Sequence, residues 1–77
     1  MTFGDALEAL KEGKSARRRG WTGTKAGVCM KLQCPDKHSK MTQPYIYSEY
    51  TERGKIRRVP WMPLQADILA EDWEVAE

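Results

Sequence analysis

The shortness of the chain is the feature that most constrains its fold. With 77 residues it has room for one domain, and a domain of this size hides only about 60% of the surface that its unfolded chain exposes. Below roughly 70–80 residues a hydrophobic core seldom supplies more than about 3–5 kcal/mol, so a disulfide, a metal or a partner subunit usually adds stability. A single domain over residues 1–77 is therefore expected to need one of these three additions.

The two cysteines, Cys29 and Cys34, do not favour a disulfide. If residues 28–33 form one extended strand, the two thiols are badly placed to bridge. Together with His38 they are three possible zinc ligands, but no CxxC or HxxxH spacing supports a metal site. Self-association is the remaining source of stability, so the sequence predicts a homo-oligomer without a metal or another cofactor.

An N-terminal helix is predicted from Phe3 to Glu12. Thr2 can accept a hydrogen bond from the Asp5 amide while the Asp5 carboxylate reaches back to the Thr2 amide, which forms a capping box. Gly13 suits the position after the helix end, where a left-handed conformation is common. Apolar residues recur at i, i+3, i+4 and i+7 and share one helix face: Phe3, Ala6, Leu7 and Leu10.

The rest of the chain predicts an antiparallel sheet of four to five strands and a short second helix, an α+β fold. Val28 to Gln33 alternates apolar and polar residues, and Pro44 to Tyr50 is rich in strand formers. Pro60 and Pro63 cannot donate to a ladder and are expected to break it. The expected strands are 14–18, 28–33, 44–50, 56–59 and 72–75, with a hairpin turn at 52–55, a surface loop at 35–43 and a helix at 64–70.

The charges are distributed unevenly along the chain. Lys and Arg number 13 against 11 Asp and Glu, a net charge of +2; the positive residues lie mostly between 11 and 58 and the acidic ones near both ends. This pattern predicts one basic and one acidic surface. No apolar stretch approaches the roughly 20 residues of a membrane span, and the polar opening segment is unlike a signal peptide. A cytoplasmic protein with reduced thiols is therefore expected.

A catalytic set is not evident in the sequence, so an enzyme is not expected. His38 has no serine or cysteine partner on an ordered segment, and the GWTG sequence at residues 20–23 lacks the lysine and the length of a phosphate loop. Asp67 and Glu71 would share a helix face, but such a pair is usually solvated, because catalytic carboxylates need burial to shift their pKa.

Binding has more support than catalysis. Trp21 and Trp61 stand in irregular segments, and loops carry function disproportionately. An indole beside an arginine suits a nucleotide, since bases stack on the ring and a guanidinium matches phosphate oxygens. Arg18 is expected to point inward, toward the rim of a pocket, while Arg17 and Arg19 face solvent. Trp73 alternates with its neighbours as in a half-buried strand and is expected in the core.

Three stretches of the sequence resemble a known family: TFGDALEALKEGK at residues 2–14, RxGWxG at 18–23 and PWxPxQxDxLAxDW at 60–73. The family is the second type of Thoeris anti-defence protein, found in phages and prophages. The resemblance implies a molecular sponge that binds cyclic ADP-ribose isomers, the messengers of Thoeris immunity, without cleaving them. It also implies a homotetramer with pockets near the subunit boundaries, and some relatives take up other cyclic nucleotides.

The resemblance implies a ligand site at the residues that match these motifs. Trp21 would stack on a base, Arg18 would pair with phosphate and Trp61 would form a wall. Gln65 and Asp67 would bond ribose hydroxyls or base edges. Tyr45 and Tyr47, from the predicted central strand, are further candidates.

Two positions depart from the pattern that the family resemblance leads us to expect. Leu64 stands where a serine is expected, which removes a hydroxyl from the implied pocket, and Thr22 stands where asparagine often follows the first tryptophan. Either departure could alter the choice of ligand or abolish its binding.

Three other functions stay open. A nucleic-acid-binding module would use the lysines, Arg57 and Arg58 along a backbone, although a net charge of +2 argues against it. Steep salt dependence would distinguish such a protein from a pocket binder. A module that binds only protein would take up no nucleotide, and a cyclic-nucleotide hydrolase would need a catalytic set.

Overall fold

The computed structural model describes residues 1–22 and 27–76 of the chain. Its first element, α1 (Phe3–Lys11), begins with the predicted capping box: the Asp5 amide donates to the Thr2 hydroxyl at 3.2 Å, and the Thr2 amide donates to the Asp5 carboxylate at 3.2 Å. The helix ends at Lys11, one residue earlier than predicted, and Glu12 is its C-cap. Gly13 follows with φ of +90°, the left-handed conformation expected after a helix end.

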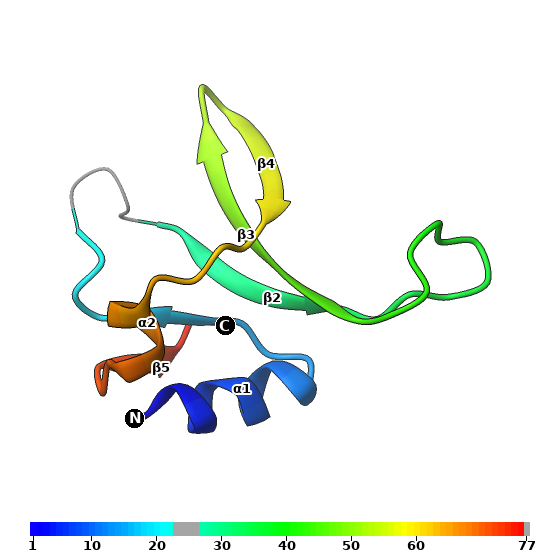
Figure 1. Cartoon of the computed structure of the whole chain (residues 1–77). Coiled ribbons are helices and arrows are strands. Elements are labelled where there is room, and N and C mark those ends of the chain that lie inside the picture. The colour runs from blue at the N-terminus through cyan, green and yellow to red at the C-terminus, as the bar shows by residue number, and fades with distance from the viewer. Residues whose placement is uncertain (23–26, 77) are drawn as a thin grey trace.

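A five-stranded antiparallel sheet follows, with the strands in the order β4-β3-β2-β1-β5. The N- and C-terminal strands β1 and β5 therefore form one side of the sheet and the β3–β4 hairpin the other (Figure 1). The strands and the second helix are β1 (Ala16–Arg18), β2 (Cys29–Gln33), β3 (Tyr45–Glu52), β4 (Lys55–Pro60), α2 (Gln65–Leu69) and β5 (Trp73–Val75). The predicted α+β fold is confirmed.

Several boundaries differ from the prediction by one or two residues, and three of these differences are informative. β1 begins two residues later than expected, because only Ala16–Arg18 pair with β5. β3 continues to Glu52, since the hairpin ladder extends to the pair Glu52–Lys55. The expectation that Pro60 breaks the ladder is wrong: Pro60 is the last residue of β4 and is paired with Tyr47. β4 is an edge strand, where proline is tolerated because its missing N–H is not required.

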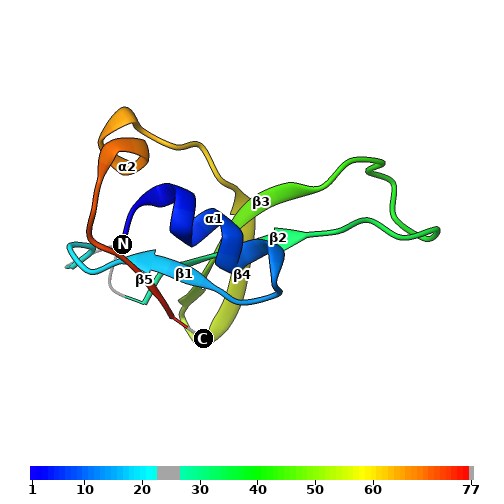
Figure 2. The same ribbon diagram turned by 90° about the horizontal axis from the view of Figure 1, so that it is seen from below.

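The core lies where α1 packs against the short strands. α1 contacts β1, β2, β5 and α2, and Figure 2 shows the helix lying across this part of the sheet. Ala16 of β1 is paired with Met30 of β2, so both side chains point to the same side of the sheet. The buried cluster is small and consists of Ala6, Leu10, Ala16, Met30 and Trp73.

The β3–β4 hairpin extends away from this core (Figure 1). All six residues of β4 are exposed. The turn between the strands uses positive φ at both central residues, Arg53 (53°) and Gly54 (78°), and such turns match the twist of a hairpin. The hairpin is therefore held mainly by the backbone pairing between β3 and β4 and by that between β3 and β2.

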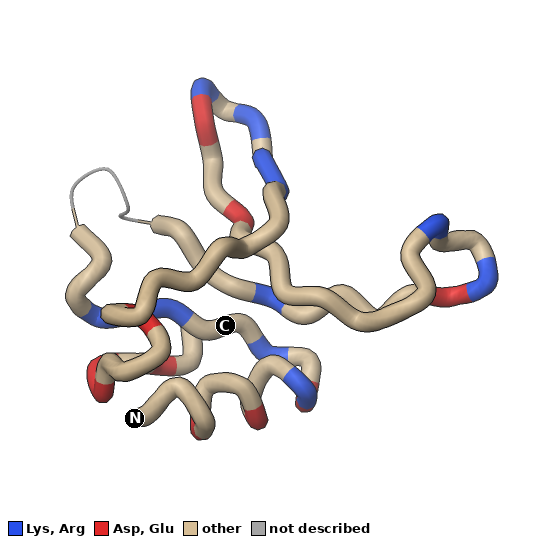
Figure 3. The backbone as a smooth tube through the Cα atoms, viewed as in Figure 1, with Lys and Arg blue, Asp and Glu red and all other residues tan. Residues whose placement is uncertain are grey.

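Ion pairs join the basic and acidic parts of the chain. Figure 3 shows lysines and arginines along the hairpin and acidic residues along α1, but cross-strand pairs bring the two signs together. Arg17 pairs with Glu74 at 3.2 Å, and Lys31 and Arg58 both pair with Glu49, at 3.1 and 2.8 Å. The predicted separation into one basic and one acidic surface is therefore only partial.

Large apolar side chains are exposed in unusual number for so small a chain. Eight of them lie in or near α2, on β4, or at or before the start of β3, and are more than a third exposed: Met41, Tyr45, Ile56, Val59, Met62, Leu64, Ile68 and Leu69. Among the described residues, no helix is long and apolar enough to cross a membrane. Contiguous apolar exposure of this kind is typical of surfaces that bind a ligand or another protein.

The N-cap gives a direct test of the α1 boundary. Thr2→Ala should lower the free energy of unfolding by about 1 kcal/mol, because the Asp5 amide loses its acceptor. Urea denaturation measures the change. Thr42→Ala, at an exposed loop position, is the matched control and should leave stability unchanged; an equal loss in both variants would contradict the capping role.

Candidate functional site

The centre of the candidate site is a cluster of aromatic rings around Trp73. Trp73 lies on β5 and is 2% exposed. Trp21, Trp61 and Phe3 surround it with ring centroids at 5.4, 5.9 and 5.5 Å, and both tryptophans meet it edge to face. Its indole N–H donates to the Asp67 carbonyl at 2.8 Å. The prediction that Trp73 belongs to the core is confirmed, and Trp21 and Trp61 pack on it while remaining partly exposed.

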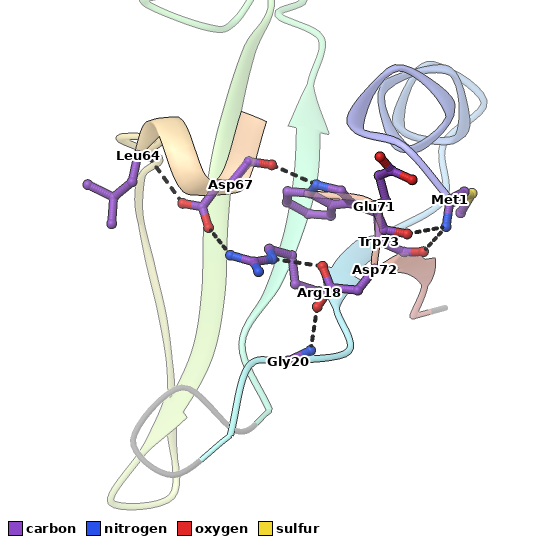
Figure 4. A network of polar contacts seen from close by, with 8 residues as sticks. All are labelled: Met1, Arg18, Gly20, Leu64, Asp67, Glu71, Asp72 and Trp73. Atoms are coloured by element: carbon purple, nitrogen blue, oxygen red, sulfur yellow. Dashed lines mark hydrogen bonds and ion pairs between the residues drawn. The ribbon is translucent and has the colours of Figure 1, made fainter. Parts of the chain in front are cut away.

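Arg18 forms a clamp with two carboxylates beside this cluster (Figure 4). Its Nη1 donates to Asp67 Oδ1 at 3.0 Å and its Nε donates to Asp72 Oδ1 at 2.9 Å. The second oxygen of each carboxylate accepts a backbone amide, that of Leu64 at 3.1 Å and that of Gly20 at 2.9 Å. Asp67 is 3% exposed, so a buried charge is paired as burial requires.

The clamp shifts the pKa values of two residues, Arg18 and Asp72. The hydrogen bond to Asp72, and next that to Asp67, raise the pKa of Arg18 above its ordinary value, with burial opposing them. The hydrogen bond from Arg18 lowers the pKa of Asp72, and the Gly20 amide lowers it further. Both shifts stabilise the charged forms.

Gly20 is required by its close approach to Asp72. A Cβ at position 20 would lie 2.8 Å from Asp72 Oδ2, closer than van der Waals contact permits. The neighbouring backbone is also tied down, because the Arg19 amide donates to the Asp72 carbonyl at 2.8 Å and the Trp21 amide to the Arg18 carbonyl at 3.1 Å. The Arg18-x-Gly20-Trp21 motif is thus a turn that is fixed to β5 and presents Trp21.

A cleft opens on the exposed side of Trp21 and Trp61. Its volume is about 260 Å³. We call it the tryptophan cleft, and its wall includes Trp21, Met30, Tyr50, Trp61, Leu64 and Asp67. Met30 is buried. The rest of this wall combines the rings of Trp21, Tyr50 and Trp61 with Asp67. Such a combination suits a flat, polar-edged ligand.

A larger and more apolar groove lies on the other side of Trp61. Its volume is about 1030 Å³. We call it the edge groove, because it runs along the part of β3 that extends past the end of β4. Its lining includes Phe3, Pro44, Tyr45, Val59, Trp61 and Ile68.

The structure brings some of the predicted site residues together and separates others. Trp21, Trp61 and Asp67 line the tryptophan cleft, and Arg18 lies behind Asp67. Tyr45 lines the edge groove instead. The ligand contacts assigned to these five residues and to Gln65, which is exposed at the start of α2, stay predictions.

Arg18 points inward and Arg17 and Arg19 are exposed, as predicted. No binding role was predicted for Asp72, which completes the clamp. The only available signal was its place beside Trp73 in the closing motif, because 54 residues separate it from Arg18.

Leu64 occupies the N-cap position of α2. A serine there would accept a helix amide, so the missing hydroxyl first concerns the helix. The Leu64 side chain makes no such bond. Its backbone amide donates to the Asp67 carboxylate at 3.1 Å.

Within residues 1–22 and 27–76, no three side chains of His, Cys, Asp or Glu come together as a metal site would require. Cys29 is partly buried and Cys34 is exposed, and both are free thiols. Burial raises the pKa of the Cys29 thiol, and Glu49 adds to this effect. A thiol shifted in this direction is a poor nucleophile.

Fold and site together define a small α+β protein in which two motif segments, near residue 20 and near residue 65, enclose an aromatic cleft. Residues 1–76 match the Thoeris anti-defense 2-like domain. The chain is also 33% identical over 88 aligned positions to Thoeris anti-defense 2 of Bacillus phage SP01, with 97% of this chain and 93% of that protein covered. The chain therefore belongs to the Thoeris anti-defense 2-like family, and this membership supports a role in phage anti-defence.

The dependence of the free energy of unfolding on pH, measured below about pH 6, tests the clamp. Because the folded-state pKa of Asp72 is lowered, the ionised carboxylate stabilises the fold above the unfolded pKa of about 4, and this contribution is lost as pH falls through the folded value. Asp72→Asn should therefore be less stable than wild type at about pH 6, and the difference should shrink below about pH 4.

Urea denaturation at a series of pH values measures this difference. The control is Glu71→Gln, next in sequence, whose side chain has no hydrogen bond or ion pair within the described part of the chain; its stability should follow wild type throughout. A gap between Asp72→Asn and wild type that is the same at every pH would show that charge is not what Asp72 contributes.

Proposed function

We propose that this chain sequesters a cyclic ADP-ribose-type nucleotide in the tryptophan cleft without cleaving it, and thereby blocks Thoeris signalling. The observation that carries the proposal is the pairing of Trp21 and Trp61 across a cleft that Tyr50 and Asp67 also line. Bases stack on such rings whatever their sequence, at about 1–3 kcal/mol per base. The anti-defence family of the chain supports a nucleotide signal as the ligand.

The size of the cleft supports partial enclosure of such a ligand. Pockets that bury a whole small molecule usually measure about 300–1,000 Å³, and the tryptophan cleft has about 260 Å³. A base with its ribose fits this space. The phosphates and the second sugar of the ligand would extend beyond it.

The electrostatics of the clamp support binding without cleavage. A general acid at neutral pH needs a raised pKa, whereas the pKa of Asp72 is lowered by Arg18. Asp67 is likewise bonded to Arg18 and to the Leu64 amide. Both carboxylates are held in place by these hydrogen bonds, and the lowered pKa of Asp72 does not suit a general acid.

The predicted contacts can be divided by position. Trp21 and Trp61 would hold the base, while Arg18 and Asp67 keep the cleft wall in place. Gln65 is exposed on α2, and Tyr45 lies in the edge groove. We assign these two to parts of the ligand that leave the cleft.

The edge groove supports a homo-oligomer, with a tetramer proposed from the family resemblance. Four of the exposed large apolar residues line it: Met41, Tyr45, Val59 and Ile68. A monomer of 77 residues with so small a buried cluster gains stability when a second copy covers this surface.

Calorimetric titration with cyclic ADP-ribose isomers tests the nucleotide proposal. Wild type should bind tightly, and heat denaturation of the complex should release intact ligand, as chromatography would show. Trp21→Ala should raise Kd by about 5- to 150-fold, because the stacking surface is lost. Trp21→Phe should bind more tightly than Trp21→Ala, and thermal unfolding shows that each variant is folded.

Tyr45→Ala is the matched aromatic control, because Tyr45 lines the neighbouring groove. It should weaken binding less than Trp21→Ala does. The opposite order would place the nucleotide in the edge groove and reject the tryptophan cleft. Recovery of a cleaved product would reject sequestration, and salt-sensitive uptake of oligonucleotides with no response to any isomer would favour a nucleic-acid-binding module.

Light scattering after size exclusion tests the oligomer. Wild type should have about four times the 8.9 kDa mass of one chain. Ile68→Asp, which puts a charge in the edge groove, should lower this mass. Leu69→Asp is the control, because Leu69 is also exposed, at 75%, but is absent from the groove lining. Dissociation by Leu69→Asp alone would show that copies associate through another surface.

A further inference from the structure

Three consecutive arginines line a second small cleft on the far side of Trp21. Its volume is about 220 Å³, and its lining includes Arg17, Arg18, Arg19, Trp21, Val28 and Glu74. Trp21 and Val28 also line the tryptophan cleft, so the two spaces adjoin. The three guanidinium groups differ in what already surrounds them.

Arg18 is a poor phosphate receptor, although it is the most buried of the three. Its guanidinium is bonded to Asp67 and Asp72 at 3.0 and 2.9 Å (Figure 4). One positive and two negative charges leave this cluster with a net formal charge of −1. A phosphate that approached Arg18 would therefore meet the repulsion of two fixed carboxylates within a few ångströms.

Arg17 is also partly neutralised. Its Nε lies 3.2 Å from Glu74 Oε1, across the β1–β5 pair, and both side chains are well exposed. An exposed pair of this kind is weak, but it cancels the charge that a phosphate would seek. Arg17 is therefore the weaker candidate for an anion contact.

Arg19 combines a fixed backbone with an uncommitted side chain. Its amide donates to the Asp72 carbonyl at 2.8 Å, so the clamp holds it in the turn that precedes Trp21. Its side chain is exposed and forms no ion pair with any carboxylate in residues 1–22 and 27–76. Among these described residues, none of its five guanidinium N–H donors has an acceptor, so they can adopt the bidentate geometry that phosphate prefers.

We propose that Arg19, not Arg18, is the specificity-determining residue that recognises the phosphate groups of the bound nucleotide, while Arg18 is a positioning residue. This assignment rests on the proposed nucleotide function. Because Trp21 lines both clefts and Arg19 lines the second, a nucleotide whose base lies against Trp21 would direct its phosphates toward Arg19. The ligand class is accordingly a base joined to a pyrophosphate.

The first experiment is titration with cyclic ADP-ribose by calorimetry at low and high salt. Arg19→Gln should raise Kd by about 10- to 100-fold, the range for loss of charge-assisted hydrogen bonds, and should flatten the salt dependence. Arg19→Lys should recover part of the affinity, because charge is restored without the planar fork. Arg17→Gln is the matched control and should change Kd much less.

The second experiment uses inorganic pyrophosphate alone and follows the arginine Nε–H signals by NMR. The Arg19 signal should shift on titration and those of Arg17 and Arg18 should shift less. This probe separates the two proposals. If wild type ignores cyclic ADP-ribose while pyrophosphate still moves Arg19, the nucleotide function fails and the anion site stands.

The outcomes that reject the inference are equally distinct. Wild type that binds cyclic ADP-ribose while Arg19→Gln binds as tightly would reject Arg19 as the phosphate contact. So would a pyrophosphate-induced shift that is largest at Arg17, Arg18 or an arginine of the β3–β4 hairpin. Either result would leave the proposed sequestration untouched.

Discussion

The contact between Arg18 and its two carboxylates is the interaction on which the rest of the structure depends. It joins β1 to α2 through Asp67 and to the segment before β5 through Asp72. The same carboxylates hold the amides of Leu64 and Gly20. Loss of one partner in such a partly buried group is costly, because an unpaired charge remains. The clamp therefore fixes the start of α2, the turn before Trp21 and the approach of β5 together.

The aromatic cluster depends on this clamp in turn. Trp73 is buried at its centre and donates to the Asp67 carbonyl. Trp21 and Trp61 pack against it in edge-to-face geometry. The residues that match the family motifs thus serve the fold first. They produce a cleft as a consequence, because Trp21 and Trp61 each have one side on Trp73 and another toward the space above Met30.

Neighbouring arginines have different roles because they differ in their acidic partners. An arginine that holds two carboxylates organises a site but attracts no anion to it, whereas one that lacks an acidic partner can. β-strand alternation places Arg18 inward and its neighbours outward, so one short run supplies both kinds. The apolar edge groove is a separate surface on the other side of Trp61.

Local pattern determined much of this protein. The capping box and the apolar spacing defined α1, alternation defined β2, and turn residues defined the β3–β4 hairpin, because each of these signals lies within a few residues. Alternation also predicted that Arg18 points inward and that Trp73 is buried. The family motifs named three candidate site residues that line the tryptophan cleft: Trp21, Trp61 and Asp67.

Only the tertiary structure decided what those residues contact. The register that pairs Arg18 with Trp73 brings Asp72 to a guanidinium 54 residues away, and no local signal encodes that register. The β2–β3 and β3–β4 pairings likewise place Tyr45 away from the tryptophan cleft and Pro60 at the end of an edge strand. The physical reason is that a carboxylate chooses its partner by distance in space, and that distance is set by the pairing of short strands from opposite ends of the chain.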